Sequence, residues 1–462
     1  ATVPRSGIGF AGVNILIISP FFPPQNSIAG QRPLSWARYW TEWGHDVTVL
    51  TTPKEAPFDS AASNGFRVIE IGPPTWYGWL WQVYRLVFPK RTAGVETRDN
   101  SSVPSTRYAR FGSLRNTLFR LNSLRQELGI LGEARMPSFA DLWIGPALNW
   151  MSGHQPWDLV VSTSWPYATH VLGYLARKKG WVRSWTADFR DLWVGNHISQ
   201  GILPFRWVES WLENRLLRRA DSITTVSPPL ADYLSTHHRT TVSVVENGFE
   251  PQELEKLAPE TAFPDDGRIR MVYAGTIYPG KRDPTPLFQV IKGMTADSAH
   301  RDRLYNLEVV FVGQNVDSVK SLAETYGIQS VVKCPGLVAR ETALRMQRDA
   351  TVLLFLEDTS HNVEGIFTGK LFEYFASRTQ FWAIGVESES ELGRLIDNSG
   401  CGISLGKSAK RIRQRLEALL SCSVKPMVEP ASDLLERYSR KTLARKMLVA
   451  TTAGLAGRSQ SG

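Results

Sequence analysis

The most constraining feature of this sequence is a buried-strand pattern that opens each half of the chain. Near the start, an apolar run at 13–19 precedes a loop at 20–30, a helix-like segment at 32–43 and a second apolar run at 46–50. Short apolar runs bounded by turn residues are typical of strands buried on both faces of a parallel sheet. Two more runs of this kind follow, at 158–164 and 222–227.

The second half restarts the pattern at 269–275 after a polar stretch, 251–267, that contains three prolines and is predicted to be a linker. Strands alternating with helices twice over predict an α/β fold with two doubly wound parallel sheets. A length of 462 residues fits two domains of roughly 200 residues each. The remaining predicted strands lie at 307–312, 331–334, 351–356 and 380–384.

The amino-acid composition indicates the cellular environment of the protein and the chemical class of its partners. The chain has three cysteines, without CxxC spacing, which argues against a disulfide scaffold or a zinc site and fits a reducing cytoplasm. No apolar run reaches the ~18 residues of a membrane span. The net charge of +9 favours anionic partners such as nucleotides or acidic lipid. No nucleic-acid-binding signature is present, so we expect no nucleic acid partner.

The region 73–153 does not fit a minimal strand–helix unit. An aromatic cluster at 76–88 is followed by a helical pattern at 107–125 that carries five arginines. A basic amphipathic helix beside aromatic residues is typical of a membrane interface. The alternative is an ordinary insertion that packs on the first sheet and leaves its arginines in water.

The loop at 275–284 follows a predicted strand directly and leads into a helix. Asp283 is a good N-cap and Pro284 a good first helical residue. The loop therefore brings free N–H groups, Lys281 and Arg282 to one helix N-terminus, which are the groups that a diphosphate requires. The alternative is a plain turn with exposed charges.

A second polar loop, 361–368, leads into a helix in which Glu373 lies among apolar residues. An unpaired buried carboxylate is costly, and a ribose diol offers it two O–H donors. An exposed helix glutamate favoured by the helix dipole is the alternative. In the first half, 188–193 follows a predicted strand at 181–186. Its charged groups suit contacts to a sugar or acceptor, or a catalytic carboxylate, although from the residues alone an internal Arg–Asp pair that holds a loop explains them better.

Together these segments resemble the family 4 glycosyltransferases, retaining enzymes of the GT-B fold, and in particular bacterial members that build polysaccharides and glycolipids. Each motif is weak alone, but the order along the chain is specific. The segments that carry the resemblance are 14–52, 187–193, 220–227, 246–249, 275–282, 335–338 and 370–374.

The resemblance implies two Rossmann-like domains that face each other across a cleft. We expect an acceptor domain at 1–255, a nucleotide-sugar donor domain at 256–435 and a C-terminal helix at 436–462 that crosses back to the first domain. The implied activity moves a sugar from a nucleotide-sugar to an acceptor hydroxyl, which is lipid-linked in some members. The family reaction needs no metal, and no cofactor is expected. A cytoplasmic protein, peripheral on the inner face of the plasma membrane, would fit.

The resemblance also implies roles for single residues. Catalysis is assigned to Asp188, Arg190, Asp191 and Lys281. The donor diphosphate is assigned to Gly30, Gln31, Arg32, Gly275, Thr276, Gly280, Lys281, Arg282, Thr368, Gly369 and Lys370. The nucleobase is assigned to Gly336, Leu337 and Val338, the ribose to Glu373, and the sugar to Glu364, Gly365, Ile366 and Phe367.

The sequence departs from the family at one carboxylate. Two glutamates with seven residues between them are common there, whereas the residue eight before Glu373 is Gly365, and Glu364 lies one further away. A catalytic role for Glu364 is therefore in doubt. Two other functions remain open: a sugar-nucleotide 2-epimerase on the same fold, and a binding protein with a degenerate site.

Overall fold

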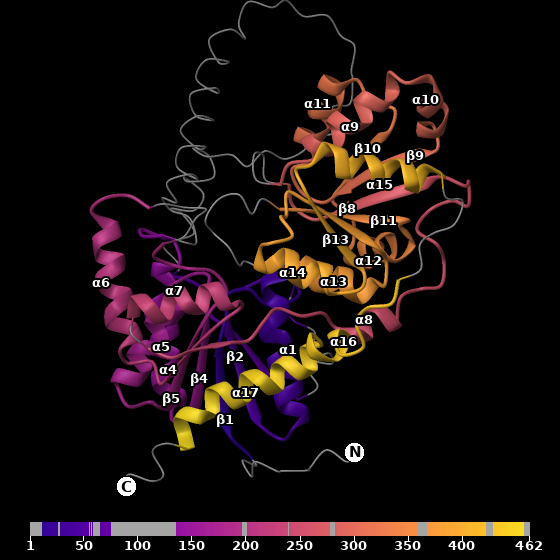
Figure 1. Ribbon diagram of the computed structural model, residues 1–462. Helices are drawn as coiled ribbons and strands as arrows, with labels where there is room; N and C mark the ends of the chain where they lie inside the picture. The colour runs from indigo at the N-terminus through magenta and orange to yellow at the C-terminus, as the bar shows by residue number, and fades with distance from the viewer. Residues whose placement is uncertain are drawn as a thin grey trace, which may run out of the picture. The chain divides into compact units, whose positions relative to one another are not determined.

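The computed structural model describes residues 12–25, 28–54, 56, 58, 65–74, 135–195, 201–238, 240–277, 282–357, 367–421 and 428–456. The chain divides into two compact units. Unit 1 comprises 1–225, 231–243 and 448–462, and unit 2 comprises 226–230 and 244–447. The predicted fold class, α/β with two doubly wound parallel sheets, is confirmed (Figure 1).

In the described part of unit 1, helices accompany a sheet of order β3-β2-β1-β4-β5-β6-β7. Its strands are β1 (Asn14–Ile18), β2 (Asp46–Thr51), β3 (Arg67–Glu70), β4 (Trp157–Thr163), β5 (Val182–Phe189), β6 (Ser222–Thr225) and β7 (Val242–Val244). Its helices are α1 (Ile28–Glu42), α4 (Asp141–His154), α5 (Ala168–Lys178), α6 (Phe205–Leu217) and α7 (Pro228–His238), whose first residues belong to unit 2. β1 is central because Ile15 to Ile18 are apolar and wholly buried, and it pairs in parallel with β2 and β4.

In the described part of unit 2, the sheet order β10-β9-β8-β11-β12-β13 repeats the pattern of the first. The strands are β8 (Ile269–Ala274), β9 (Leu307–Val312), β10 (Val332–Gly336), β11 (Val352–Leu356), β12 (Phe381–Ile384) and β13 (Gly402–Gly406). The helices are α8 (Pro251–Glu255), α9 (Thr285–Thr295), α10 (Ser298–Leu304), α11 (Asp317–Tyr326), α12 (Arg340–Asp349), α13 (Gly369–Ser377), α14 (Glu391–Asp397), α15 (Ala409–Ser421), α16 (Leu434–Arg437) and α17 (Arg440–Ala456), whose residues from 448 on belong to unit 1.

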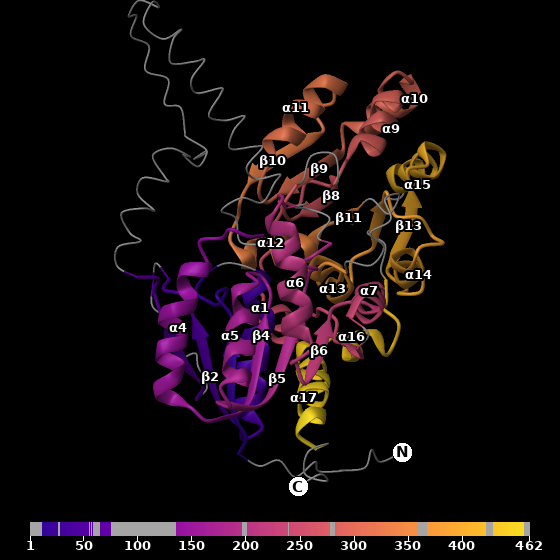
Figure 2. The same cartoon turned by 90° about the vertical axis from the view of Figure 1, so that its left-hand side faces the viewer.

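The second sheet has an apolar core on each face. Met271 and Tyr273 of β8 pack with residues of α9, α11 and α15, whereas Val272 and Ala274 pack with residues of α12 and α13. Figure 2 shows α9 and α11 on one side of this sheet and α12 and α13 on the other. Successive side chains of a strand point to opposite faces, so a strand covered on both faces is apolar at most positions. This is why residues 271–274 of β8 form a continuous apolar run in the sequence.

The strand order places a ligand-binding position in each unit. Neighbouring crossovers leave in opposite directions between β1 and β4 of unit 1 and between β8 and β11 of unit 2. Open parallel sheets bind their ligands outside the carboxyl ends of the strands at such a switch point. In unit 2 these ends lead to Gly275 and Glu357.

Candidate functional sites at the strand ends

Lys370 is the residue aimed at the switch point of unit 2. It lies in the first turn of α13 and is buried, with its ammonium 3.7 Å from the centroid of the Tyr273 ring. A Cβ added to Gly275 would lie 2.6 Å from the Lys370 Nζ. The absence of a side chain at Gly275 therefore leaves room for this ammonium at the end of β8.

The backbone at this position also requires glycine. A Cβ on Gly313, which follows β9, would lie 2.0 Å from the carbonyl oxygen of Gly275. Gly275 has φ +145° and Gly313 φ +134°, a region that other residues rarely adopt. The two glycines let the ends of β8 and β9 approach closely, and this keeps the ammonium of Lys370 next to main-chain atoms.

The charges around Lys370 are mixed. Arg282 donates from Nη1 to the carbonyl oxygen of Thr276 at 3.3 Å, and its Nε lies 3.4 Å from Glu357. Burial, and next the nearby Arg282 cation, hold the pKa of Lys370 well below its usual value, although Glu357 and Glu373 oppose the shift. An anion bound here would relieve the repulsion between the two cations.

The N-terminus of α13 lies beside these cations. Thr368 is extended, with φ −68° and ψ 148°, and its side chain makes no capping hydrogen bond to the helix. Its Oγ1 is buried and has no hydrogen-bond partner among the described residues. Gly369 and Lys370 begin the helix, so their N–H groups lie at its positive end. Six of the residues assigned to the diphosphate are thus gathered in unit 2: Gly275, Thr276, Arg282, Thr368, Gly369 and Lys370.

Glu373 has a protein partner that the sequence did not reveal. Arg340, the first residue of α12, donates from Nη2 to Glu373 at 3.1 Å and to Glu253 of α8 at 2.6 Å. Arg440 of α17 is buried nearby, 4.0 Å from Glu253. Despite burial, the charges of Glu373 and Glu253 raise the pKa of Arg340. Glu373 is therefore neither unpaired nor exposed, and any ribose contact would add to this ion pair.

The residues assigned to the base and the sugar lie in different surroundings. Gly336 ends β10 with φ +85° and accepts a hydrogen bond from the Gly313 N–H at 2.8 Å. Leu337 is 69% exposed, and Val338 packs against the core beside α13. Phe367 is buried in that same core.

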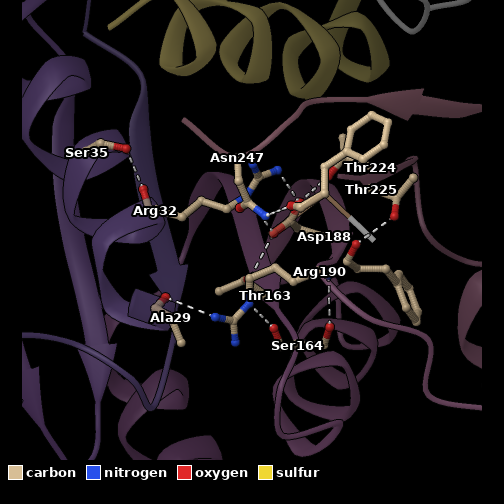
Figure 3. Close-up of polar contacts among 12 residues, drawn as sticks. Ala29, Arg32, Ser35, Thr163, Ser164, Asp188, Arg190, Thr224, Thr225 and Asn247 are labelled. Carbon is tan, nitrogen blue, oxygen red and sulfur yellow. Dashed lines mark hydrogen bonds and ion pairs between the residues drawn. The ribbon is translucent and has the colours of Figure 1, made fainter. Parts of the chain in front are cut away.

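In unit 1, Asp188 is fully buried and surrounded by donors (Figure 3). Arg32 donates to it from Nε at 3.2 Å and from Nη2 at 2.8 Å. Thr163 and Thr224, on the neighbouring strands β4 and β6, each donate a hydroxyl at 2.8 Å. Burial alone would raise the pKa of Asp188, but Arg32 and these hydrogen bonds outweigh it, and the pKa lies below its usual value.

Two sequence-based assignments need correction here. Asp188 does not follow a strand at 181–186 but lies inside β5, which runs to Phe189, because its four hydrogen bonds make a buried strand position tolerable for a carboxylate. Gly30 does not end a loop at 20–30 but lies in α1, as do Gln31 and Arg32, and Arg32 forms an ion pair with Asp188. The alternative prediction for 188–193 was an internal Arg–Asp pair, and Asp188 does form an ion pair, but its partner Arg32 comes from α1, outside that segment.

Two charged residues, Arg190 and Asp191, follow Asp188 in the loop after β5. Arg190 donates from Nη1 to the Ala29 carbonyl oxygen at 3.0 Å and from Nε to the carbonyl oxygen of Ser164 (Figure 3). Removal from water raises the pKa of the Asp191 carboxyl, although Arg190 opposes this. Arg190 thus ties the loop after β5 to the start of α1 and the end of β4.

His170 of α5 is a residue that the sequence pattern did not single out. It is buried, stacks on Phe189 with ring centroids 4.5 Å apart, and shares a 2.8 Å hydrogen bond with Ser162 through Nδ1. Burial lowers the pKa of His170 to about 3, so its ring is neutral near pH 7. The sequence alone does not predict this environment, because His170 comes close to Phe189 only when α5 packs on β5.

Several assigned residues lie outside the described residues, namely Gly280, Lys281, Glu364, Gly365 and Ile366, as does most of the region 73–153. Within the part of the chain that the structure describes, no helix is long and apolar enough to cross a membrane. Among the same residues, no group of three or more His, Cys, Asp or Glu is placed to hold a metal ion.

Comparisons with known proteins agree with this architecture. Residues 29–248 match the family model for a glycosyl transferase 4-like domain. No curated protein matches the sequence. Among solved structures, sucrose-phosphate synthase from Thermosynechococcus elongatus is 13% identical, with a TM-score of 0.56 over 97% of this chain and 100% of that one.

Two further structures are similar over nearly the whole chain. WaaG, a glycosyltransferase involved in lipopolysaccharide biosynthesis, is 13% identical, with a TM-score of 0.51 over 96% of this chain and 98% of its own. Anabaena Alr3699/HepE in complex with UDP-glucose is 12% identical, with a TM-score of 0.54 over 96% of this chain and 100% of its own. At such identities the likeness shows the fold, which is that of the GT-B glycosyltransferases.

Proposed function

We propose that the chain is a retaining, metal-independent glycosyltransferase, because residues 29–248 match the family model for a glycosyl transferase 4-like domain, in line with the resemblance seen in the sequence. It would move a sugar from a nucleotide-sugar to an acceptor hydroxyl. The observation that carries the proposal is the buried Lys370 ammonium, held beside Gly275 at the switch point of unit 2.

The donor diphosphate is proposed to bind at this switch point. Lys370 and Arg282 supply positive charge, and the start of α13 supplies N–H groups and the hydroxyl of Thr368. These groups stabilise the negative charge that develops on the leaving diphosphate. Lys281 and Gly280 are proposed to add to this site from the preceding loop. The complex of Alr3699/HepE with UDP-glucose supports a nucleotide-sugar as the donor.

The ribose is proposed to contact Glu373, and the base the main chain at 336–338. Arg340 fixes the position of the Glu373 carboxylate, which presents its remaining lone pairs to a diol. The sugar is proposed to lie near 364–367.

On the acceptor side, Arg190 and Asp191 are proposed to contact the acceptor or sugar, and Asp188 to position Arg32 and the loop that holds them. The acceptor is proposed to be a lipid-linked saccharide, in cell-envelope polysaccharide or glycolipid synthesis in a bacterium. The likeness to WaaG in fold supports this choice. The protein would then act in the cytoplasm, at the inner face of the plasma membrane.

Calorimetric titration of the whole chain with UDP, GDP, ADP and dTDP tests the donor site. We expect at least one of these diphosphates to bind and the corresponding nucleoside to bind much more weakly, because the charged groups recognise the diphosphate. A mass-spectrometric screen of nucleotide-sugars against polyprenyl-linked and small acceptors then tests the transfer. Binding by no nucleotide would overturn the proposal in favour of a scaffold on this fold.

Replacing Glu373 with alanine is expected to raise the donor KM about tenfold or more and to change kcat little, since a ribose contact is made in both the ground and transition states. The variant should also lose the preference for the ribonucleotide over its 2′-deoxy form. Steady-state kinetics with both donors measures the two effects.

Glu253 provides a matched control, because it also pairs with Arg340 but is not assigned to the ribose. Glu253→Ala should therefore leave the preference for the ribonucleotide intact. An equal loss of this preference in both variants would show that Glu373 acts only through Arg340.

A further inference from the structure

The outer face of α6 in unit 1 exposes large apolar side chains. Trp207 is 70% exposed and Trp211 is 59% exposed, and a spacing of four residues places them on the same face of the helix. Leu203, just before the helix, is 61% exposed. Such side chains gathered on one face indicate an interaction surface, because exposing them to water is unfavourable.

The charges of this segment are sorted between its two faces. The acidic residues point inward: Glu209 is buried and lies 2.8 Å from Arg135, and Glu213 is buried and lies 3.0 Å from His238. The exposed charges of 203–219 are all positive, at Arg206, Arg215, Arg218 and Arg219. The guanidinium of Arg215 lies 5.2 Å from the Trp211 ring centroid, so cations and indoles form one continuous surface.

We propose that this face of α6 docks on the surface of an anionic lipid bilayer. Indole rings partition to the level of the lipid headgroups, and arginines beside them are attracted to acidic lipids. The exposed charges of 203–219, all of one sign beside the two indoles, complement an anionic bilayer. α6 is too short and too charged to span a membrane, so it would lie in the plane of the interface.

The inner face of α6 connects this surface to the loop after β5. The Trp193 Nε1 donates to Glu209 at 3.2 Å, and the Val194 N–H donates to Glu213 at 2.9 Å. A docked α6 would therefore hold the acceptor loop, which includes Arg190 and Asp191, close to the lipid surface. This step rests on the proposed lipid-linked acceptor and specifies where that acceptor is presented.

Vesicle co-sedimentation without any nucleotide tests the docking by itself. The whole chain should pellet with vesicles of phosphatidylcholine and phosphatidylglycerol and much less with phosphatidylcholine alone. W207S/W211S should lower the partition coefficient about tenfold or more, since the two indoles supply the apolar contact. W207F/W211F should retain part of the binding. R218Q/R219Q should reduce the preference for the anionic vesicles, and added salt should weaken binding to them.

Tyr305→Ser is the matched control, because Tyr305 is 71% exposed but lies in unit 2. It should bind vesicles as the unsubstituted chain does. Equal binding by W207S/W211S and the unsubstituted chain, or no binding of the latter to anionic vesicles, would overturn the docking proposal. So would a dimer in light scattering that W207S/W211S abolishes, because a second copy would then cover this face. Nucleotide titration of the same samples shows separately whether the donor site is intact.

Discussion

Replacing Lys370 with methionine lowers the affinity for nucleoside diphosphates by about a hundredfold or more, and transfer activity falls with it. The reason is that a buried cation beside a bound phosphate makes a charge-assisted contact that water does not replace. Methionine preserves most of the volume of the side chain, so the core around Tyr273 stays filled. Calorimetry for binding and initial rates for transfer measure the two effects.

The pH dependence of binding gives a second readout for Lys370. Its pKa is depressed in the unliganded protein, and a bound anion favours the charged form, so binding takes up a proton. Affinity should therefore fall as pH rises through the depressed pKa of Lys370. This is best measured above about pH 7, where the diphosphate itself is fully ionised. The methionine variant should lack this dependence.

Lys292 offers a matched control for Lys370. Its ammonium also lies over a tyrosine ring, 5.6 Å from the Tyr326 centroid. Lys292 is exposed, however, and lies within helix α9 rather than at the end of a strand. Lys292→Met should leave diphosphate affinity unchanged. If Lys370→Met binds diphosphate as tightly as Lys292→Met does, the donor site is not at the switch point of unit 2.

Replacing Asp188 with alanine has the largest expected effect on stability, a loss of about 3–5 kcal/mol, because it leaves Arg32 charged and buried without its partner. Asp188→Asn should cost less, since the amide oxygen can still accept from one of the hydroxyls of Thr163 and Thr224, and the amide NH2 can donate to the other. Denaturant unfolding measures both, and the asparagine variant keeps the comparison available if the alanine variant does not fold.

The pair between Arg67 and Asp46 is the control for this substitution. It has the same residue types and two hydrogen bonds, at 2.8 and 2.9 Å, but its side chains are 60% and 57% exposed. Asp46→Ala should cost at most about 1 kcal/mol, because water solvates both groups. Similar losses for Asp188→Ala and Asp46→Ala would contradict the role of the buried pair.

Lowering the pH should destabilise the protein in the same way as removing the ion pair between Asp188 and Arg32. The folded pKa of Asp188 lies below the unfolded value, so the stabilisation is present above the unfolded value and disappears as pH falls through the folded one. Asp188→Asn should remove this contribution to the acid limb of the stability curve. A curve of the same steepness in the variant would mean that other carboxylates dominate acid unfolding.

The predicted phosphate-binding residues show which features of a site local sequence can predict and which depend on tertiary packing. The glycine after β8 and the helix start at Thr368 were found because a strand end and a helix N-terminus each have local signatures. That Lys370 would turn into the space beside Gly275 was not foreseen, since the two residues meet only when β8 and β11 become neighbours in the sheet.

Glu373 is a second case, in which the sequence predicted that a partner is needed but not which residue it is. Its apolar surroundings in the sequence predicted a need for a partner, and a partner is present. The partner is Arg340, which the sequence pattern did not single out, because α12 and α13 meet only through tertiary packing. Arg340 occupies the first turn of its helix, and an arginine at that position carries no distinctive local pattern.

By itself, the sequence determined two parallel sheets, each with loops at its strand ends. It did so through the series of buried-strand patterns that occurs once in each half of the chain. Burial on both faces favours apolar residues at most strand positions, and this preference is visible in short stretches of sequence. Only the tertiary structure decided which charges meet. Arg32 and Asp188 stand 156 residues apart, and their pairing depends on the order in which strands enter the sheet.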